Sequence, residues 1–236
     1  MSSIFGVSGV DDALDKAIAI PSARVRAKVA KLRARHPHAS PERIISILEK
    51  QFTRASKLSG AGVGAAAAVP AVGTASAVVL TSAQVAAFLA ASALHVMAVA
   101  EVHGIPTEDT ERRRTLLLTA LLGEDGASAV QASLGISSVS WAKRALQMLP
   151  ISTVKSVNTT LRKRAAKKAA AKGGGIAVGR LAPFGIGAVI GWSGGKALAR
   201  TVIEGTRAAF GPAPTSFASL EENRAATLPE QIEQNA

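Results

Sequence analysis

The chain has 236 residues, carries a formal net charge of +12 and contains no Cys. The absence of Cys excludes disulfides, thiolate nucleophiles and cysteine-based metal sites. Hydrophobic residues make up 48% of the chain but aromatic residues only 3%, so the apolar side chains are mostly small, and the composition favours an all-α protein.

The charges are distributed in blocks along the chain. Residues 1–57 carry 11 basic and 5 acidic side chains, and residues 151–210 carry 11 and 1, whereas the stretch from Gly211 onward carries 1 and 4. Such blocks indicate a polyanionic partner, either anionic lipid or nucleic acid, with a merely solvated surface as the alternative. Residues 1–20 lack a basic region followed by an apolar core, so we expect a protein that stays on the cytoplasmic side.

Two helices are expected in residues 1–35, which we treat as an N-terminal segment. The first is short and runs from Ser8 or Gly9 to about Ile20. The second has apolar residues at helical spacing surrounded by cations, a pattern typical of helices that lie on anionic membrane surfaces. The basic residues expected to contact lipid head groups here are Arg24, Arg26, Lys28, Lys31, Arg33 and Arg35.

A further helix begins after Ser40, which is a good N-cap followed by Pro41 at the first helical position. One apolar face is expected from its spacing, formed by Ile44, Ile45, Leu48 and Phe52.

The longest unusual feature is an uncharged tract of 42 residues, from Ser59 to Ala100. As one continuous helix it would measure about 63 Å at about 1.5 Å per residue, whereas a membrane span needs about 20 residues. The length therefore predicts a helical hairpin with a turn near Thr81–Ser82, and Pro70 is expected to kink the first helix or delay its start.

Small residues in this tract recur at four-residue spacing, which allows helices to pack closely. The expected helix-packing positions are Gly60, Gly64, Ala68, Pro70, Gly73 and Ala77. The tract contains 16 Ala but only 13 Val, Leu, Phe or Met residues, so the favourable free energy of its insertion into a bilayer is marginal. The hairpin could dip into one leaflet, span the bilayer with help, or stay buried beneath other helices.

The second half of the chain repeats the alternation of polar and apolar stretches. We expect a leucine-rich helix capped by Thr107 and ended by Gly123 and Gly126, and another helix at about 138–149. A basic, Ala-rich helix should stop at Gly173, and its expected head-group contacts are Arg162, Lys163, Arg164, Lys167, Lys168 and Lys172. A shorter apolar segment, 181–195, follows, and residues 211–236 are expected to form a disordered tail.

No motif supports catalysis. Gly60, Gly62 and Ala65 fit a dinucleotide fingerprint, but no strand precedes them and no acidic residue follows at the required distance. His95 lies inside the uncharged tract, where we expect a neutral side chain hydrogen-bonded to a neighbouring carbonyl rather than a metal ligand or proton relay. We predict a non-enzymatic protein with no catalytic, cofactor-binding or metal-binding residues.

The order of these features resembles the EcsC family of bacterial proteins. The matching stretches are "HPHASPERIISILEKQFTRASKLSGAGVGAAAAVPAVGT", "FLAASALHVMAVAEVHGI", "DTERRR" and "APFGIGAVIGWSGGKALARTVIEGTRAAF" within residues 36–210. His103 departs from the resemblance, because an aromatic residue is expected before Gly104. The resemblance implies a helical, membrane-associated protein, with a membrane protein such as an ABC transporter as a partner, and it supplies no catalytic residues.

The sequence therefore predicts an all-α bundle built around a Gly/Ala-rich apolar hairpin, with a second, shorter hairpin-like segment. The functional hypothesis is a membrane-associated accessory or lipid-interacting protein on the cytoplasmic face, in contact with anionic lipids. A soluble nucleic-acid-binding protein and a lipid carrier are the alternatives. The oligomeric state stays open.

Overall fold

The computed structural model describes residues 7–67, 74–135, 142, 149–180 and 186–217. For residues 7–11, 59–67, 74–82, 166, 168–180 and 186–194, the description covers the backbone only. The described residues form eight helices and no strand, which confirms the all-α prediction. The helices are α1 (Val7–Ile18), α2 (Ser22–Arg35), α3 (Pro41–Ala67), α4 (Thr74–Val102), α5 (Thr110–Leu122), α6 (Glu124–Leu134), α8 (Ile151–Arg180) and α9 (Ile186–Phe210).

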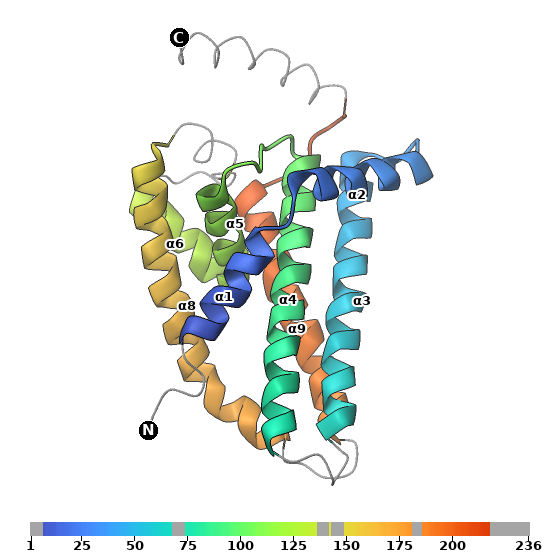
Figure 1. The fold of residues 1–236 in the computed structure, drawn as a ribbon. Helices are drawn as coiled ribbons and strands as arrows, with labels where there is room; N and C mark the ends of the chain where they lie inside the picture. Colours follow the sequence, from blue (N-terminus) through green and yellow to red (C-terminus); the bar gives the residue numbers. More distant parts are fainter. Residues whose placement is uncertain (1–6, 68–73, 136–141, 143–148, 181–185, 218–236) are drawn as a thin grey trace.

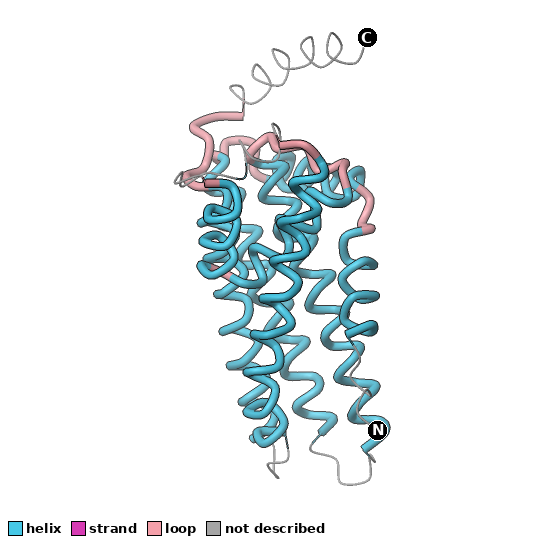
Figure 2. Tube along the Cα trace, turned by 90° about the vertical axis from the view of Figure 1, so that its left-hand side faces the viewer, coloured by secondary structure: helices cyan, strands magenta, loops and turns pink. Residues whose placement is uncertain are grey.

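The long helices α3, α4, α8 and α9 run along one axis and give the bundle two distinct ends (Figures 1 and 2). At the end we call the hairpin end, α3 and α8 finish while α4 and α9 begin (Figure 1). At the opposite end, which we call the α2 end, α2 lies across the bundle and α9 finishes (Figure 1). The most extensive contact between helices is that of α3 with α9.

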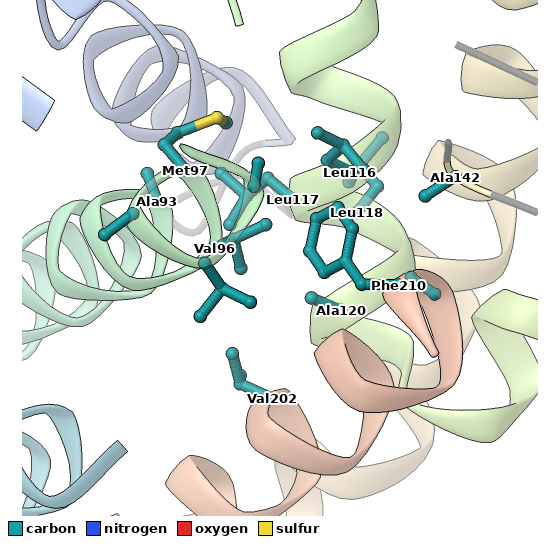
Figure 3. Close-up of a cluster of buried hydrophobic side chains, with 14 of the residues drawn as sticks. Ala93, Val96, Met97, Leu116, Leu117, Leu118, Ala120, Ala142, Val202 and Phe210 are labelled. Atoms are coloured by element: carbon teal, nitrogen blue, oxygen red, sulfur yellow. The ribbon is translucent and has the colours of Figure 1, made fainter. Parts of the chain in front are cut away.

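The core draws buried residues from all eight described helices, and the part shown in Figure 3 lies between α4, α5 and α9. The second half of the uncharged tract is part of this core, because Ala93, Val96 and Ala100 of α4 are fully buried against other helices of the protein. Residues 83–102 are long and apolar enough to cross a membrane, yet 56% of that stretch is buried inside the protein. Protein rather than lipid therefore encloses this half of the tract.

Arg113 joins the N-terminal helices to the bundle. Its buried guanidinium donates to the carbonyl oxygens of Ile18 at 2.9 Å and Ile20 at 2.7 Å, and also contacts the Thr107 carbonyl and the Ser22 hydroxyl. These acceptors include the backbone between α1 and α2, where the helix ladder leaves carbonyl groups without partners. One side chain of α5 thereby fixes the direction in which α2 leaves α1.

Three expected helix boundaries are wrong. Gly123 ends α5 as expected, but Gly126 lies inside α6, a helix that was not predicted. The turn predicted at Thr81–Ser82 lies within α4, which is continuous from Thr74, so the hairpin connection falls at 68–73 and includes Pro70. The basic helix does not stop at Gly173, because α8 continues to Arg180. Glycine disfavours helices by only about 1 kcal/mol per residue, which neighbouring packing overrides. The helix predicted at 138–149 lies outside the described residues, except for Ala142 and Leu149.

One predicted cap is confirmed and one is wrong. The Ser40 hydroxyl accepts from the backbone N–H of Arg43 at 3.2 Å, as expected for the start of α3. At α5 the cap is Asp109 rather than Thr107, since its carboxylate accepts from the backbone N–H of Arg112 at 2.8 Å. Thr107 is instead buried, and its carbonyl accepts from Ser22 at 3.0 Å.

The residues that follow α9 pack on the α2 end. The Phe217 ring lies 4.2 Å from Cζ of Arg33 in α2 and packs partly buried against the core. The first part of the predicted tail, 211–217, is therefore placed on the bundle, while residues 218–236 lie outside the described residues.

Gly195 allows the closest approach of α9 to α3. A Cβ at this position would lie 2.3 Å from the Ser56 carbonyl oxygen, well inside contact distance. Glycine to alanine in an ordinary helix position is stabilising, but here we expect Gly195→Ala to lower the free energy of unfolding by about 1–3 kcal/mol, because the two backbones must separate. Urea unfolding followed by circular dichroism measures the change. The exposed Ala197→Ser change on the same helix is the control, and a stabilised Gly195→Ala protein would contradict the packing.

Candidate functional site

The hairpin end gathers uncharged stretches that are far apart in the sequence. The last nine residues of α3 and the first residues of α4 belong to the uncharged tract, and the first ten residues of α9 belong to the second apolar segment. Figure 1 shows these helix ends side by side, and Figure 2 shows the same grouping from another direction. The tertiary structure thus combines two separate apolar sequences into one end of the molecule.

The depth of this uncharged zone is set by two lysines. On α3 the last charge is Lys57, ten residues before the helix ends at Ala67, and on α9 the first charge is Lys196, ten residues after the start at Ile186. Ten helical residues measure about 15 Å. This equals about half of a bilayer's hydrocarbon core, which is about 30 Å thick.

Large apolar side chains are exposed next to this zone. Leu58 of α3 is 73% exposed, Leu198 of α9 is 50% exposed, and Val85 of α4 is 38% exposed. Leu58 and Leu198 lie on opposite sides of the crossing of Ser56 with Gly195, Leu58 two residues towards the hairpin end and Leu198 three residues away from it. Ile151, 40% exposed at the start of α8, is the fourth exposed large hydrophobic residue among the described side chains. Three of these four residues thus border the uncharged zone.

Basic side chains of the same two helices lie close to the exposed leucines. Arg54 and Lys57 precede Leu58 on α3, while Lys196 precedes and Arg200 follows Leu198 on α9. Arg54, Lys196 and Arg200 are exposed, and Arg200 pairs with Glu204 at 2.7 Å. On α3 this order, with an uncharged helix end, then an exposed leucine, then cations, matches the change from hydrocarbon to head groups across one leaflet. On α9 the cation Lys196 lies between the uncharged helix start and Leu198.

The basic helix α2 does not have the free apolar face that a membrane-surface helix needs. Its apolar residues Val25, Val29 and Leu32 are buried in the core of the protein. Burial lowers the pKa of Lys28 from its ordinary value. The remaining predicted cations, Arg24, Arg26, Lys31, Arg33 and Arg35, are exposed. Figure 1 places α2 at the end opposite the uncharged helix ends, so the two predicted features do not adjoin.

The second basic segment lies on α8, which runs from the α2 end to the hairpin end (Figure 1). Arg162, Lys163, Arg164 and Lys167 are exposed on this helix. Lys168 and Lys172 belong to the same helix, but their side chains lie outside the described part. Of the two predicted basic segments, only this one extends towards the uncharged zone.

The predicted helix-packing residues fall mostly outside the description. Gly60 and Gly64 belong to α3, and Ala77 belongs to α4, but their surroundings are not described. Ala68, Pro70 and Gly73 lie in or beside the connection at 68–73, outside the described residues. The close backbone contacts that the structure does describe are made by Gly126, Gly195 and Gly205. A Cβ on Gly205 would lie 2.6 Å from the Ala120 carbonyl oxygen. The spacing of glycines in the sequence did not predict which of them make close contacts between helices.

His95 is buried without a hydrogen-bond partner among the described residues. Its side chain is 3% exposed, and neither ring nitrogen has a donor or acceptor within reach. The ring stacks on Phe52 with centroids 4.8 Å apart. Burial, with the positive charges of Lys28 and Arg207, lowers the pKa of His95 to about 3. The expected hydrogen bond to a carbonyl is therefore wrong, and the neutral imidazole packs as an aromatic ring.

A cavity of about 490 Å³ lies at the α2 end, between α3, α4, α9 and residues 211–213. Its lining includes Glu42, Glu49 and Arg207, and the last two form an ion pair at 2.7 Å. His103 also lines it, stacked on Phe210 with centroids 5.3 Å apart. Charged walls do not suit an acyl chain, so this cavity gives no support to a lipid carrier.

Comparisons of the chain with models of protein families, with curated proteins and with solved structures found no match.

Proposed function

We propose that the protein is a non-enzymatic, membrane-associated helical protein that inserts the uncharged ends of α3, α4 and α9 into one leaflet of an anionic membrane, on the cytoplasmic face. The observation that carries the proposal is the meeting of the uncharged ends of α3, α4 and α9 at one end of the bundle, with exposed leucines and cations bordering them. Leu58 and Leu198 border the hydrocarbon, and Arg54 and Lys57 lie behind Leu58 at the level of the phosphates. Lys196, two residues nearer the hairpin end than Leu198, reaches the phosphates by extending its side chain.

The charge-free depth of α3, α4 and α9 supports insertion of these three helix ends into one leaflet rather than spanning. The end of α8, which includes Lys172 and Arg180, is not part of the uncharged zone. Spanning would draw Glu49 and Lys50 of α3, together with Arg200 of α9, into the hydrocarbon. Charged side chains at the bilayer centre cost about 2.5–3.5 kcal/mol each even on the most lenient scale. Residues 83–102 of α4 could cross alone by length, but their burial in the bundle ties α4 to its charged neighbours.

The resemblance to the EcsC family within residues 36–210 agrees with this proposal. The resemblance suggests a role as an accessory factor to a membrane protein, such as an ABC transporter. In the single-leaflet position the rest of the bundle stays in the cytoplasm, where it can contact such a partner. The basic segment of α8 supplies further contacts with anionic head groups as that helix descends to the hairpin end.

Flotation with lipid vesicles tests the association itself. We expect the protein to float with vesicles containing phosphatidylglycerol and to remain partly bound at about 1 M NaCl, where the Debye length is about 3 Å and only insertion still holds it. Phosphatidylcholine vesicles should bind less. Complete recovery of the protein below the vesicles at low salt would overturn the proposal.

Single cysteines distinguish insertion from spanning, and the natural absence of Cys makes their labelling clean. In vesicle-bound protein, we expect Thr74→Cys at the start of α4 to be protected from an impermeant maleimide supplied outside or inside the vesicle. Ala34→Cys, exposed on α2, should react from outside. Reaction of Thr74→Cys from the lumen would show a spanning hairpin and contradict the one-leaflet position.

Nucleic-acid binding remains the rival explanation of the positive charge. The exposed cations of α2 and the cations of α8 are divided between different parts of the bundle, and none is interleaved with an exposed aromatic residue in the described part of the chain. Tight, steeply salt-dependent binding to duplex DNA without vesicle flotation would favour this rival.

A further inference from the structure

We propose that the exposed cations of α2 form a docking surface for the chain's own acidic C-terminal segment, residues 218–236. This α2 basic surface consists of Arg24, Arg26, Lys31, Arg33 and Arg35. The proposal is independent of membrane insertion, because α2 lies at the end of the bundle opposite the hairpin end (Figure 1).

The orientation of the surface is fixed by the packing beneath it. Val25, Val29 and Leu32 point into the core, so the cations between them point outward. The helix contains no acidic residue, and Glu108 from outside it pairs with Arg26 at 2.8 Å. Arg24, Lys31 and Arg35 have no ion pair within the described part of the chain. Like charges held on one short helix repel one another, which favours binding of an anionic segment.

The described chain leads directly to this surface. After α9, residues 211–217 pass over the α2 end, and Phe217 stacks on the guanidinium of Arg33, with Cζ 4.2 Å from the ring centroid. A cation–π contact of this kind anchors the chain beside α2. Residue 218 therefore begins next to the basic surface.

The charge and length of the following segment match the surface. It contains Glu221, Glu222, Glu230 and Glu233 but only one cation, Arg224. Glu221 and Glu222 follow Phe217 by four and five residues, a reach of up to about 18 Å in an extended chain. Arg24 and Arg33 are nine residues apart on α2, which is about 14 Å. The first two carboxylates can thus reach any cation of α2.

The covalent connection to α9 explains why this segment, rather than an external anion, is proposed to bind the α2 basic surface. A short tether holds the carboxylates at an effective concentration in the millimolar range. Weak surface ion pairs that would not hold a free peptide can then keep the segment bound. An external polyanion must displace it, so the segment limits non-specific binding to the α2 basic surface.

Distance measurement between spin labels tests the contact in the purified full-length protein. Labels are placed at Ala27→Cys on α2 and Ala226→Cys in the acidic segment; Ala27 is exposed, and the chain has no other Cys. We expect a narrow, short distance distribution at about 0.01 M salt that becomes long and broad at about 1 M salt, because the Debye length falls from about 30 Å to about 3 Å.

Two variants identify the interacting charges, and a third is the control. The α2 variant R24E/K31E/R35E and the segment variant E221Q/E222Q/E230Q/E233Q should each lose most of the short-distance population at low salt. K155E/K163E/K167E, which reverses three exposed cations of α8, should keep it. Unchanged distances in both the α2 and the segment variants, or an equal loss in the α8 variant, would overturn the proposal. Circular dichroism confirms that each variant retains its helices.

Discussion

Replacement of Leu58 and Leu198 by Glu is expected to abolish binding of the protein to anionic vesicles while leaving the fold intact. Both side chains are largely exposed, so the substitution removes little from the core. Transfer of a leucine side chain out of water contributes about 1.5–3 kcal/mol. Loss of two such contributions is about 3 kcal/mol or more, which corresponds to a fall in vesicle affinity of about 100-fold. The repulsion between the new carboxylates and anionic lipids adds to this loss.

Vesicle flotation over a range of lipid concentrations measures the loss, and the structure offers a matched control. Ile151→Glu places one such charge on an exposed large hydrophobic side chain at the α2 end of α8, to be compared with Leu58→Glu and Leu198→Glu made singly. We expect this control to bind as the natural protein does. An equal loss in the control and in the single leucine variants would show that any added negative charge weakens binding, and full binding of the double variant would exclude the hairpin end as the contact.

Acidification from pH 7 to pH 5 is expected to destabilise the protein through His95. Folded His95 stays neutral down to its lowered pKa of about 3, whereas the same side chain in the unfolded chain takes up a proton below its ordinary pKa of 6.5. The unfolded state therefore binds more protons between these values, and stability falls as the pH falls through this window. At pH 5 the loss is about 2 kcal/mol, since one pKa unit corresponds to about 1.4 kcal/mol.

Urea unfolding of the natural protein and of His95→Phe at both pH values isolates this contribution. The phenylalanine ring keeps the stack on Phe52 and removes two buried nitrogens that have no partners in the described structure. We expect the pH-dependent loss to shrink by about 2 kcal/mol in the variant and its stability at pH 7 to be at least that of the natural protein. The same pH dependence in both proteins would contradict a buried neutral His95. His38→Phe, at an exposed histidine, serves as the control.

Local sequence signals located most helices correctly. Ser40 and Pro41 marked the start of α3, and the spacing of Val25, Val29 and Leu32 identified the buried side of α2. These features depend on a few neighbouring residues, through capping and helical periodicity. Boundaries within Gly/Ala-rich stretches could not be located in this way. The hairpin turn and the end of α8 both differ from the prediction, because small residues have weak preferences that packing overrides.

By itself, the sequence determined an all-α protein with two uncharged stretches and two basic helices, since composition and periodicity are properties of the chain. Only the tertiary structure decided which of these features lie at the same end of the helical bundle. It brought the starts of α4 and α9 together with the end of α3, enclosed the second half of the uncharged tract in protein, and placed α2 at the far end. The physical reason is that an apolar face can be buried by lipid or by another helix, and the sequence of that face is the same in both cases.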